Sequence, residues 1–381
     1  MRTLRFYGTL SLAALWAQGG CGEPFSTGPA AATTSSGSGG GEGGAGGAGG
    51  AGGVEDVPSG TTSSSSSGGG GAGGCDACKE GEFCTVTETC LPCNDRRGVL
   101  SFGPLTEIDV EGTEPSFPRV RAEVGEDGAT QRLVYVARFG GASHTDIATA
   151  TGRPWTGGAV LVNAQINTGR SESGPLLLPV DAPSPVSDMP PGPLLFDHPL
   201  AGPGSLPAVF AADFPEGARV ELIDDLLVDA GSHSVAVAHA LSPARYWFMS
   251  MHQDNGVTVS RLVTKRAGDA AVQPVNIKLP GGCPAEGADL APWVTPDGSL
   301  LFFQAPYSAL GDCAQAVVLR SFYVRLGADG LPVGEQPATI LLPNEPPRVA
   351  VKTPSLSPDE CTLFVASNAD GAQRLYSAAR R

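Results

Sequence analysis

The sequence predicts an all-β fold for residues 98–381, and three observations lead to this prediction. Short runs of alternating apolar and polar residues recur through this region and are bounded by Pro or Gly, which is the pattern of β-strands. No stretch of about twelve residues shows the 3.6-residue periodicity of an amphipathic helix. The same order of strands and turns also returns along the chain, as expected for a repeat architecture.

The repeat is clearest near the C-terminus. Residues 353–379 read TPSLSPDECTLFVASNADGAQRLYSAA, and residues 291–305 read APWVTPDGSLLFFQA. Each unit has a Ser/Thr-Pro turn, an alternating apolar strand, a loop and a second strand, with a further strand ahead of it. Earlier counterparts lie at 240–251 (ALSPARYWFMSM) and within 115–150, where the turn motif is lost. A diverged unit fits between these two, so we expect five units of about four strands.

Two of the units carry a more specific motif, Ser-Pro-Asp at 357–359 and Thr-Pro-Asp at 295–297, each just before a strand. These units resemble the Pro-Asp type of WD-repeat-like β-propeller, found in the Tol-system propeller protein and in many exported bacterial proteins. The resemblance implies a propeller of about five, or six, four-stranded blades. Because the chain ends on a strand at 375–379, we expect a strand near 99–110 to complete the last blade and close the ring.

The turn residues of these motifs have a clear physical role. Pro296 and Pro358 fix φ at the second position of a tight turn. Asp297 and Asp359 follow them and suit a sharp reversal between two strands. The four residues are therefore expected to mark equivalent turns of two blades.

Residues 1–20 are typical of a signal peptide. A basic start precedes the apolar run 10–16, which is too short to cross a bilayer because that takes about 20 residues. Cys21 follows Gly20, and this layout resembles bacterial lipoproteins, in which a small residue precedes the Cys that receives the lipid. Gln18 departs from the motif, which usually has an aliphatic residue there. Ordinary signal-peptidase cleavage shortly before Cys21 is the alternative.

A flexible tether is predicted to follow. Residues 21–74 are rich in Gly, Ser, Ala and Thr and have no apolar surface to offset the entropy of ordering, so we expect them to be disordered. A coil of that length spans roughly 40 Å. Cys21 is the expected lipid attachment residue, and Gly22 after it, where retention in the inner membrane would favour Asp, indicates the outer membrane or cell surface.

The nine cysteines indicate an oxidising compartment. If Cys21 carries a lipid, an even number remains, and an exported chain with an even count is typically disulfide-bonded. A short module at 75–97 holds five of them and is too small for a hydrophobic core, so cross-links are expected to stabilise it. The disulfide candidates are Cys75, Cys78, Cys84, Cys90, Cys93, Cys283, Cys313 and Cys361.

A zinc site is the alternative reading of the module. Cys75 and Cys78 form one knuckle and Cys90 and Cys93 a second, close to the spacing of a four-Cys site. Cys84 between them is a fifth thiol that such a site does not need, so disulfides are favoured. With Cys283 and Cys313 as mates inside one later repeat, the cysteine left over in the module is expected to reach Cys361 and join the module to the end of the domain.

No catalytic, metal or cofactor motif is apparent. Ser143, His144 and Asp146 are close together in the sequence GASHTD, but adjacency along the chain is no sign of a catalytic triad. The His residues lack a metal-ligand spacing, and the acidic pair Asp224-Asp225 with Asp229 is best explained by surface solvation. We therefore predict no catalytic residue, no metal and no cofactor.

Charge and organisation lead to a functional hypothesis. The net charge of −15 argues against nucleic acid, which binds basic surfaces. We expect a cell-envelope lipoprotein, held at a membrane by its N-terminal lipid, whose propeller is a non-enzymatic binding or scaffold domain for an envelope protein, a glycan or an external ligand. The alternative is an exported propeller hydrolase acting on polysaccharide or peptide; a periplasmic partner of an envelope complex is less favoured because of the long tether.

Overall fold

The computed structural model describes residues 78–79, 81–85, 87–125, 128–152, 155–160, 164–199, 207–215, 217, 219–223, 226, 235–241, 244–254, 257–285, 290–308, 313, 318–334, 337–346 and 348–381. The predicted signal peptide (1–20) and the predicted tether (21–74), with Cys21, lie outside these residues, and so does Cys75. Within the described part of the chain, no helix is long and apolar enough to cross a membrane.

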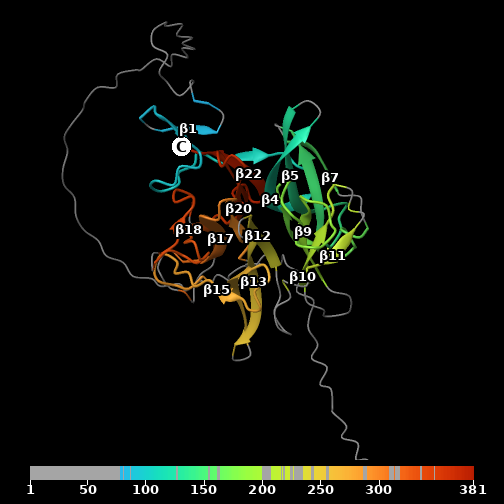
Figure 1. The fold of residues 1–381 in the computed structure, drawn as a ribbon. Helices are drawn as coiled ribbons and strands as arrows, with labels where there is room; N and C mark the ends of the chain where they lie inside the picture. The colour runs from blue at the N-terminus through green and yellow to red at the C-terminus, as the bar shows by residue number, and fades with distance from the viewer. Residues whose placement is uncertain are drawn as a thin grey trace, which may run out of the picture. The chain divides into compact units, whose positions relative to one another are not determined.

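Five four-stranded antiparallel sheets form the blades of a propeller, which confirms the predicted fold and settles the blade number (Figure 1). Neighbouring innermost strands contact one another around the ring, and the labels of β4, β12 and β20 lie together at its middle in Figure 1. From the innermost strand outward, blade 1 is β4 (Thr113–Gly125), β5 (Gly128–Arg138), β6 (Asp146–Thr151) and β7 (Thr156–Val160), and blade 2 is β8 (Ser173–Leu177), β9 (Leu194–Pro199), β10 (Pro207–Ala212) and β11 (Val220–Leu222). In the same order, blade 3 is β12 (Val235–Leu241), β13 (Ala244–Asp254), β14 (Val257–Arg266) and β15 (Gln273–Pro274), and blade 4 is β16 (Trp293–Val294), β17 (Leu300–Tyr307), β18 (Val318–Arg325) and β19 (Thr339–Ile340). Blade 5 is β20 (Val351–Leu356), β21 (Thr362–Ser367), β22 (Arg374–Ala379) and β3 (Thr106–Ile108).

The ring closes within blade 5, where strands from the two ends of the domain share one sheet. β3 pairs antiparallel with β22, with Ile108 opposite Leu375 and Thr106 opposite Ser377. An isolated bridge between Phe102 and Arg380 extends the pairing. The prediction that a strand near 99–110 completes the last blade is confirmed.

Apolar side chains fill the spaces between neighbouring blades. One cluster joins blades 3 and 4 through Trp247, Phe303 and Phe322, and another joins blades 5 and 1 through Tyr135 and Phe364. All five of these side chains are at most 1% exposed. Each sheet therefore buries both of its faces, which explains why the strands of blades 4 and 5 have nearly continuous apolar sequences.

Inner strands share a distortion that the sequence pattern did not predict. A residue with positive φ stands directly before a Pro in four blades, at Phe117 (φ 51°), Gly174 (φ 56°), Ala291 (φ 42°) and Thr353 (φ 49°). The ladder shifts register there in β4, β8 and β20, as it does at a β-bulge. Three of these residues are not Gly, so surrounding contacts must hold the strained backbone.

Arg119 supplies much of that support. Its side chain extends from β4 toward blades 4 and 5 and donates hydrogen bonds to the carbonyls of Pro118 (3.0 Å), Thr353 (3.1 Å), Pro354 (3.3 Å) and Pro292 (3.5 Å). Arg119 is only 3% exposed. One guanidinium thus satisfies carbonyls from three blades where their inner strands bulge.

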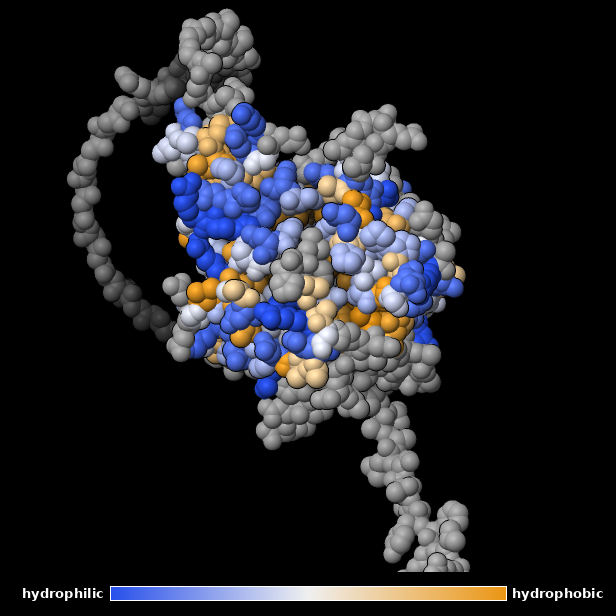
Figure 2. Space-filling model, in the orientation of Figure 1, coloured by the Kyte–Doolittle hydropathy of each residue, from blue (hydrophilic) through white to orange (hydrophobic). Residues whose placement is uncertain are grey.

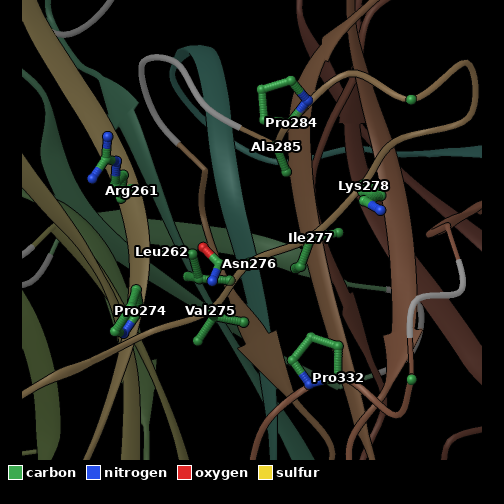
Figure 3. Close-up of a pocket in the computed structure, with 12 residues that line it drawn as sticks. Arg261, Leu262, Pro274, Val275, Asn276, Ile277, Lys278, Pro284, Ala285 and Pro332 are labelled. Carbon is green, nitrogen blue, oxygen red and sulfur yellow. The ribbon is translucent and has the colours of Figure 1, made fainter.

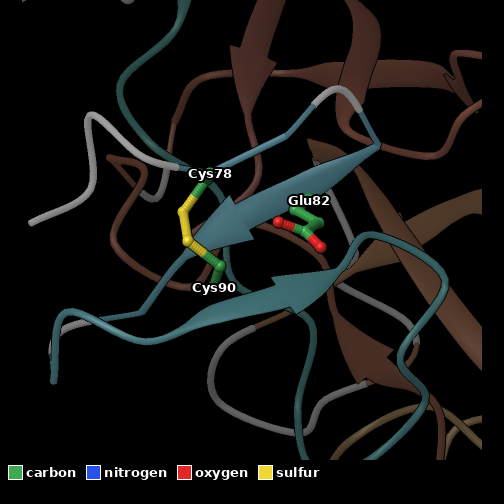
Figure 4. A group of neighbouring side chains, drawn as sticks. All are labelled: Cys78, Glu82 and Cys90. Atoms are coloured by element: carbon green, nitrogen blue, oxygen red, sulfur yellow. A yellow bond between two sulfur atoms is a disulfide. The ribbon is translucent and has the colours of Figure 1, made fainter. Parts of the chain in front are cut away.

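The Cys-rich module is a small β-hairpin attached to blade 5. β1 (Glu82–Cys84) pairs with β2 (Cys90–Pro92), and the Cys78–Cys90 disulfide links the hairpin to the residues before it (Figure 4). A second disulfide joins Cys93 to Cys361, in the turn between β20 and β21. The module is therefore bound covalently to the end of the domain.

Two arginines strengthen this attachment. Arg96 of the module pairs with Glu360 and, at 3.7 Å, with Asp297, and both acids belong to the repeat turns of blades 5 and 4. Arg380 donates to the carbonyls of Cys93 and Asp95. The repeat turns thus have a second role, because they present carboxylates to the module.

Disulfide bonding is confirmed, and the zinc alternative is not supported. Cys283 pairs with Cys313, and Cys84 is disulfide-bonded to a cysteine outside the described residues. Cys78, Cys90 and Glu82 lie close enough together to hold a metal, but the two sulfurs are bonded to each other and are not free thiolates (Figure 4). Such bonds persist in oxidising compartments outside the cytoplasm, which is compatible with an exported protein.

Replacing Cys93 and Cys361 together by Ala should lower the free energy of unfolding by roughly 3–5 kcal/mol, because the bridge restrains an unfolded loop of 268 residues. The matched control is Cys283→Ala/Cys313→Ala, whose 30-residue loop predicts a loss smaller by about 2 kcal/mol. Urea unfolding followed by Trp fluorescence measures both. Equal losses would contradict the loop-length argument.

Candidate functional site

Four titratable side chains gather where blades 1 and 2 meet: His144, Asp146, Glu172 and His198. We call this group the His/carboxylate site. His144 lies in the β5–β6 loop and Asp146 begins β6, while Glu172 directly precedes β8 and His198 lies on β9. The backbone N–H of Glu172 donates to the carbonyl of Thr145 at 3.1 Å, and the Thr145 hydroxyl donates to the Glu172 carbonyl at 2.8 Å. These two bonds join the segments that carry the site.

Glu172 and His198 form the inner pair of the site. The Nδ1 atom of His198 lies 3.2 Å from Oε1 of Glu172, although the ring is not turned to make a well-aligned hydrogen bond. The Glu172 side chain is fully buried, and its Oε2 atom has no hydrogen-bond partner among the described residues. Burying a carboxylate oxygen without a partner is costly. Such a cost is typical of functional sites, where polar groups are arranged for chemistry and not for stability.

His144 and Asp146 form the outer pair. Nε2 of His144 lies 3.7 Å from Oδ1 of Asp146, and their side chains are 31% and 13% exposed. Burial raises the pKa of the Asp146 carboxyl; the neighbouring His144 opposes this change and the negative charge of Glu172 adds to it. Asp146 therefore holds its proton more tightly than an exposed Asp does, and only a small fraction of its side chain is exposed to solvent.

Strand alternation separates Asp197 from this site. Successive residues of a strand point to opposite faces, so Asp197 faces away from its neighbour His198. Asp197 lies instead beside Ser173, whose hydroxyl is 3.4 Å from Oδ2, as expected for residues that oppose each other across β8 and β9. His198 shares its face with Phe196, which packs against blade 1.

The site does not form a single metal centre. Among the described residues, Cys78, Glu82 and Cys90 are the one group of three or more metal-ligating side chains whose donor atoms approach within 4.8 Å of one another. The two pairs of the His/carboxylate site are thus separate in space. Their arrangement suits proton transfer, in which each imidazole or carboxyl acts on a different atom of a bound substrate.

A cavity of about 450 Å³ lies between β14 and the segment 274–285, with Pro332 also on its wall (Figure 3). Arg261 and Lys278 are the charged residues of its lining, and most of the rest are apolar. No carboxylate and no nucleophile lines it among the described residues. The described lining of the cavity therefore offers no carboxyl group for hydrolysis, and the His/carboxylate site is the better candidate.

The described surface offers no broad apolar face. Figure 2 shows hydrophilic residues over most of the described part of the visible face, with apolar residues scattered among them. The exposed large hydrophobic residues in the described part are Val99, Val180 and Val333, which are far apart in the chain. Isolated exposed apolar residues are normal for soluble proteins and indicate no docking site.

Most of the residues singled out from the sequence lie outside the His/carboxylate site, and His144 and Asp146, which belong to it, were not predicted to be functional. Pro296, Asp297, Pro358 and Asp359 lie in the turns before β17 and β21, far along the chain from the site. The acidic residues 224, 225 and 229 lie outside the described residues. The sequence GASHTD contains His144 and Asp146, the two members of the outer pair. Their partners in the site, Glu172 directly before β8 and His198 on β9, are distant from them in the sequence.

Comparison with known proteins adds only structural likeness. No protein-family model matches the chain, and a search of curated proteins finds no match. An α-L-arabinofuranosidase from Podospora anserina, solved with cellotriose, is 14% identical with a TM-score of 0.41, and the match covers 74% of this chain and 96% of that one. An endo-arabinanase from Bacillus licheniformis is 11% identical with a TM-score of 0.41, covering 71% and 95%. A mannose phosphorylase from Leishmania mexicana is 10% identical with a TM-score of 0.40, covering 73% and 88%.

These matches correct one prediction from the sequence. The propeller was expected to be a non-enzymatic binding or scaffold domain, yet the three solved structures named above are two glycoside hydrolases and a phosphorylase. The prediction of a non-catalytic domain is therefore wrong by this comparison. At such low identity the likeness concerns the fold and assigns no residue of this chain.

Asp146→Asn should stabilise the protein at pH 7 by up to about 1 kcal/mol. Because the folded state raises the pKa of Asp146, this carboxyl adds stability below its unfolded pKa and loses that contribution as pH rises through its folded value. The Asn side chain carries no charge, so the variant avoids the free-energy cost of burying a charged carboxylate. Its gain in the free energy of unfolding over the parent should therefore shrink toward pH 3. The control is Asp181→Asn, at an exposed position of blade 2. Chemical unfolding at both pH values measures the difference; an advantage that is the same at both contradicts the assignment.

Proposed function

We propose that this protein is an exported hydrolase that cleaves glycosidic bonds at the His/carboxylate site. The observation that carries the proposal is a largely buried carboxyl with a raised pKa, Asp146, in the same group as an imidazole backed by a buried carboxylate, His198 with Glu172. Glycosidic cleavage needs a general acid to protonate the leaving oxygen and a base to activate water. Two titratable groups in different environments suit these opposite roles.

The roles follow from the raised pKa of Asp146 and the full burial of Glu172. Asp146 gives its proton to the glycosidic oxygen as the bond to the anomeric carbon breaks. A water molecule attacks that carbon, and His198 accepts the proton that the water loses. Glu172 is fully buried and cannot touch a substrate, so it acts through His198 as a positioning residue. His144, beside Asp146, stabilises the carboxylate that forms when Asp146 gives up its proton.

A glycan fits this set of groups better than a peptide. Peptide hydrolysis on a protein scaffold generally uses a Ser or Cys nucleophile with an oxyanion hole, or a metal-bound water. The four residues of the site include no hydroxyl and no thiol, and no three of them have donor atoms within 4.8 Å of one another. Acid and base groups alone are sufficient for an inverting glycosidase.

We also propose that Cys21 carries a lipid and holds the enzyme at the cell envelope, with the signal peptide at 1–20, the tether at 21–74, the Cys-rich module at 75–97 and the propeller at 98–381. The disulfides, which need an oxidising compartment, support export. A long tether would let an anchored hydrolase reach polymeric substrates around the cell.

The activity test uses the full chain, exported and purified with its disulfides intact, against aryl glycosides, arabinan, mannan and casein. We expect hydrolysis of a glycan and a loss of about 100-fold or more in kcat for Asp146→Asn and for His198→Gln, because each removes a proton-transfer group. Asp181→Asn, the exposed control, should stay within about twofold of the parent. Cleavage of casein alone, no cleavage of any substrate, or full activity in both site variants would overturn the proposal.

Replacing Cys21 by Ser tests the anchor separately. The parent should partition with membranes and incorporate radiolabelled palmitate, whereas Cys21→Ser should appear in the soluble fraction because the acyl chains supply the membrane affinity. Gly22→Ala is the control and should remain membrane-bound. Equal partitioning of the parent and Cys21→Ser would rule out anchoring through this residue.

A further inference from the structure

We propose that Thr168 is a positioning residue of the His/carboxylate site: it fixes the carboxylate of Glu172 and, through it, the tautomer of His198. The catalytic consequence rests on the proposed function, whereas the tautomer of His198 can be measured without any substrate. Thr168 lies in the segment between β7 and β8, four residues before Glu172.

Thr168 binds one oxygen of Glu172 through two donors. Its hydroxyl lies 2.7 Å from Oε1 and its backbone N–H lies 3.1 Å from the same atom. Oε1 is also the oxygen that approaches Nδ1 of His198. Because Oε2 of Glu172 accepts no hydrogen bond within the described part of the chain, Thr168 is the group that determines which way this carboxylate faces.

The segment that carries Thr168 is itself held in place at two further points. The Asn167 side chain accepts from the N–H of Ile147 at 2.8 Å and donates to the carbonyl of the same residue at 2.9 Å. Ile147 is fully buried and follows Asp146 on β6. Together with the two bonds between Thr145 and Glu172, these contacts tie both ends of the segment 167–172 to β6 and to the residue before it, which holds the backbone N–H of Thr168 beside Oε1 of Glu172.

The chemical consequence concerns the proton on His198. A neutral imidazole carries one proton, and the atom that bears it is set by the hydrogen bond available to each nitrogen. A carboxylate held beside Nδ1 favours the proton there, which leaves Nε2 as the basic nitrogen. If Oε1 turns away, that preference is lost and a fraction of the His198 side chains lose the basic nitrogen at Nε2.

The test compares Thr168→Val, which removes the hydroxyl but keeps the shape and the backbone donor, with Thr168→Ser, which keeps both donors. Long-range ¹⁵N–¹H NMR of the full, oxidised chain reports the tautomer of His198. We expect the Nδ1–H form in the parent and in Thr168→Ser, and a mixture in Thr168→Val. Thr130→Val, on an exposed position of β5, is the control and should match the parent. Thr168→Ala repeats the measurement if the Val variant does not fold.

Kinetics supply the second readout. On the glycan identified for the parent, Thr168→Val should lower kcat about tenfold with KM within about twofold, because the base is misplaced while substrate contacts remain. An unchanged tautomer in both Thr168→Val and Thr168→Ala, or a Ser variant that behaves like Val, overturns the positioning role. A changed tautomer in a protein that cleaves no glycan supports the positioning role and rejects the proposed function, so the two failures are distinguishable.

Discussion

Closure of the ring is the constraint on which the rest of this structure depends. A propeller blade buries apolar residues on both faces, so each blade needs a neighbour on either side, and an open ring would expose the inner faces of blades 1 and 5. β3 removes this problem by joining blade 5 from the N-terminal side of the domain. Three residue pairs are a short ladder for that task. The Cys93–Cys361 disulfide and the pairing of Arg96 with Glu360 place a second link beside it, which keeps the two ends together when the ladder opens.

A closed ring also brings the inner strands so near one another that their backbone carbonyls need hydrogen-bond donors from neighbouring blades. Near the positive-φ residues Phe117, Ala291 and Thr353, Arg119 binds the carbonyls of Pro118, Pro292, Thr353 and Pro354 with one side chain. An arginine suits this role because its donors are spread over a rigid plane and its charge is never lost. The strain at the bulges is therefore offset by contacts that exist only when blades 1, 4 and 5 are in place, which makes the ring more cooperative.

Sequence reasoning reached the fold because strands, turns and repeats are local. The alternating runs, the Pro-Asp turns and the final strand each predicted a feature that depends on neighbouring residues, and the parity of the cysteines predicted a bridge to Cys361. The His/carboxylate site could not be found this way. His144 and Asp146 are near each other in sequence, but Glu172 and His198 join them only because blade 2 packs on blade 1. The positive-φ residues of the inner strands could have been found in the sequence, because each is followed by Pro. In two blades this residue stands four positions before the turn motif, at Ala291-Pro292 and Thr353-Pro354. The same combination occurs at Phe117-Pro118 and Gly174-Pro175.

The contrast between two buried charged residues is the strongest reason to assign function to blades 1 and 2. Arg119 and Glu172 are both removed from water, but the guanidinium donates to carbonyls on three blades, whereas one oxygen of the carboxylate finds no hydrogen-bond partner in the part of the chain that the structure describes. Hydrogen bonds to a buried charged group, as at Arg119, stabilise the folded state. The arrangement at Glu172 costs free energy, and its neighbours increase that cost, because a second carboxyl, Asp146, lies near enough for the charge of Glu172 to raise its pKa. A fold selected for stability alone would be expected to replace such a pair with apolar residues. Retaining it supports the proposal that Asp146 and His198 transfer protons.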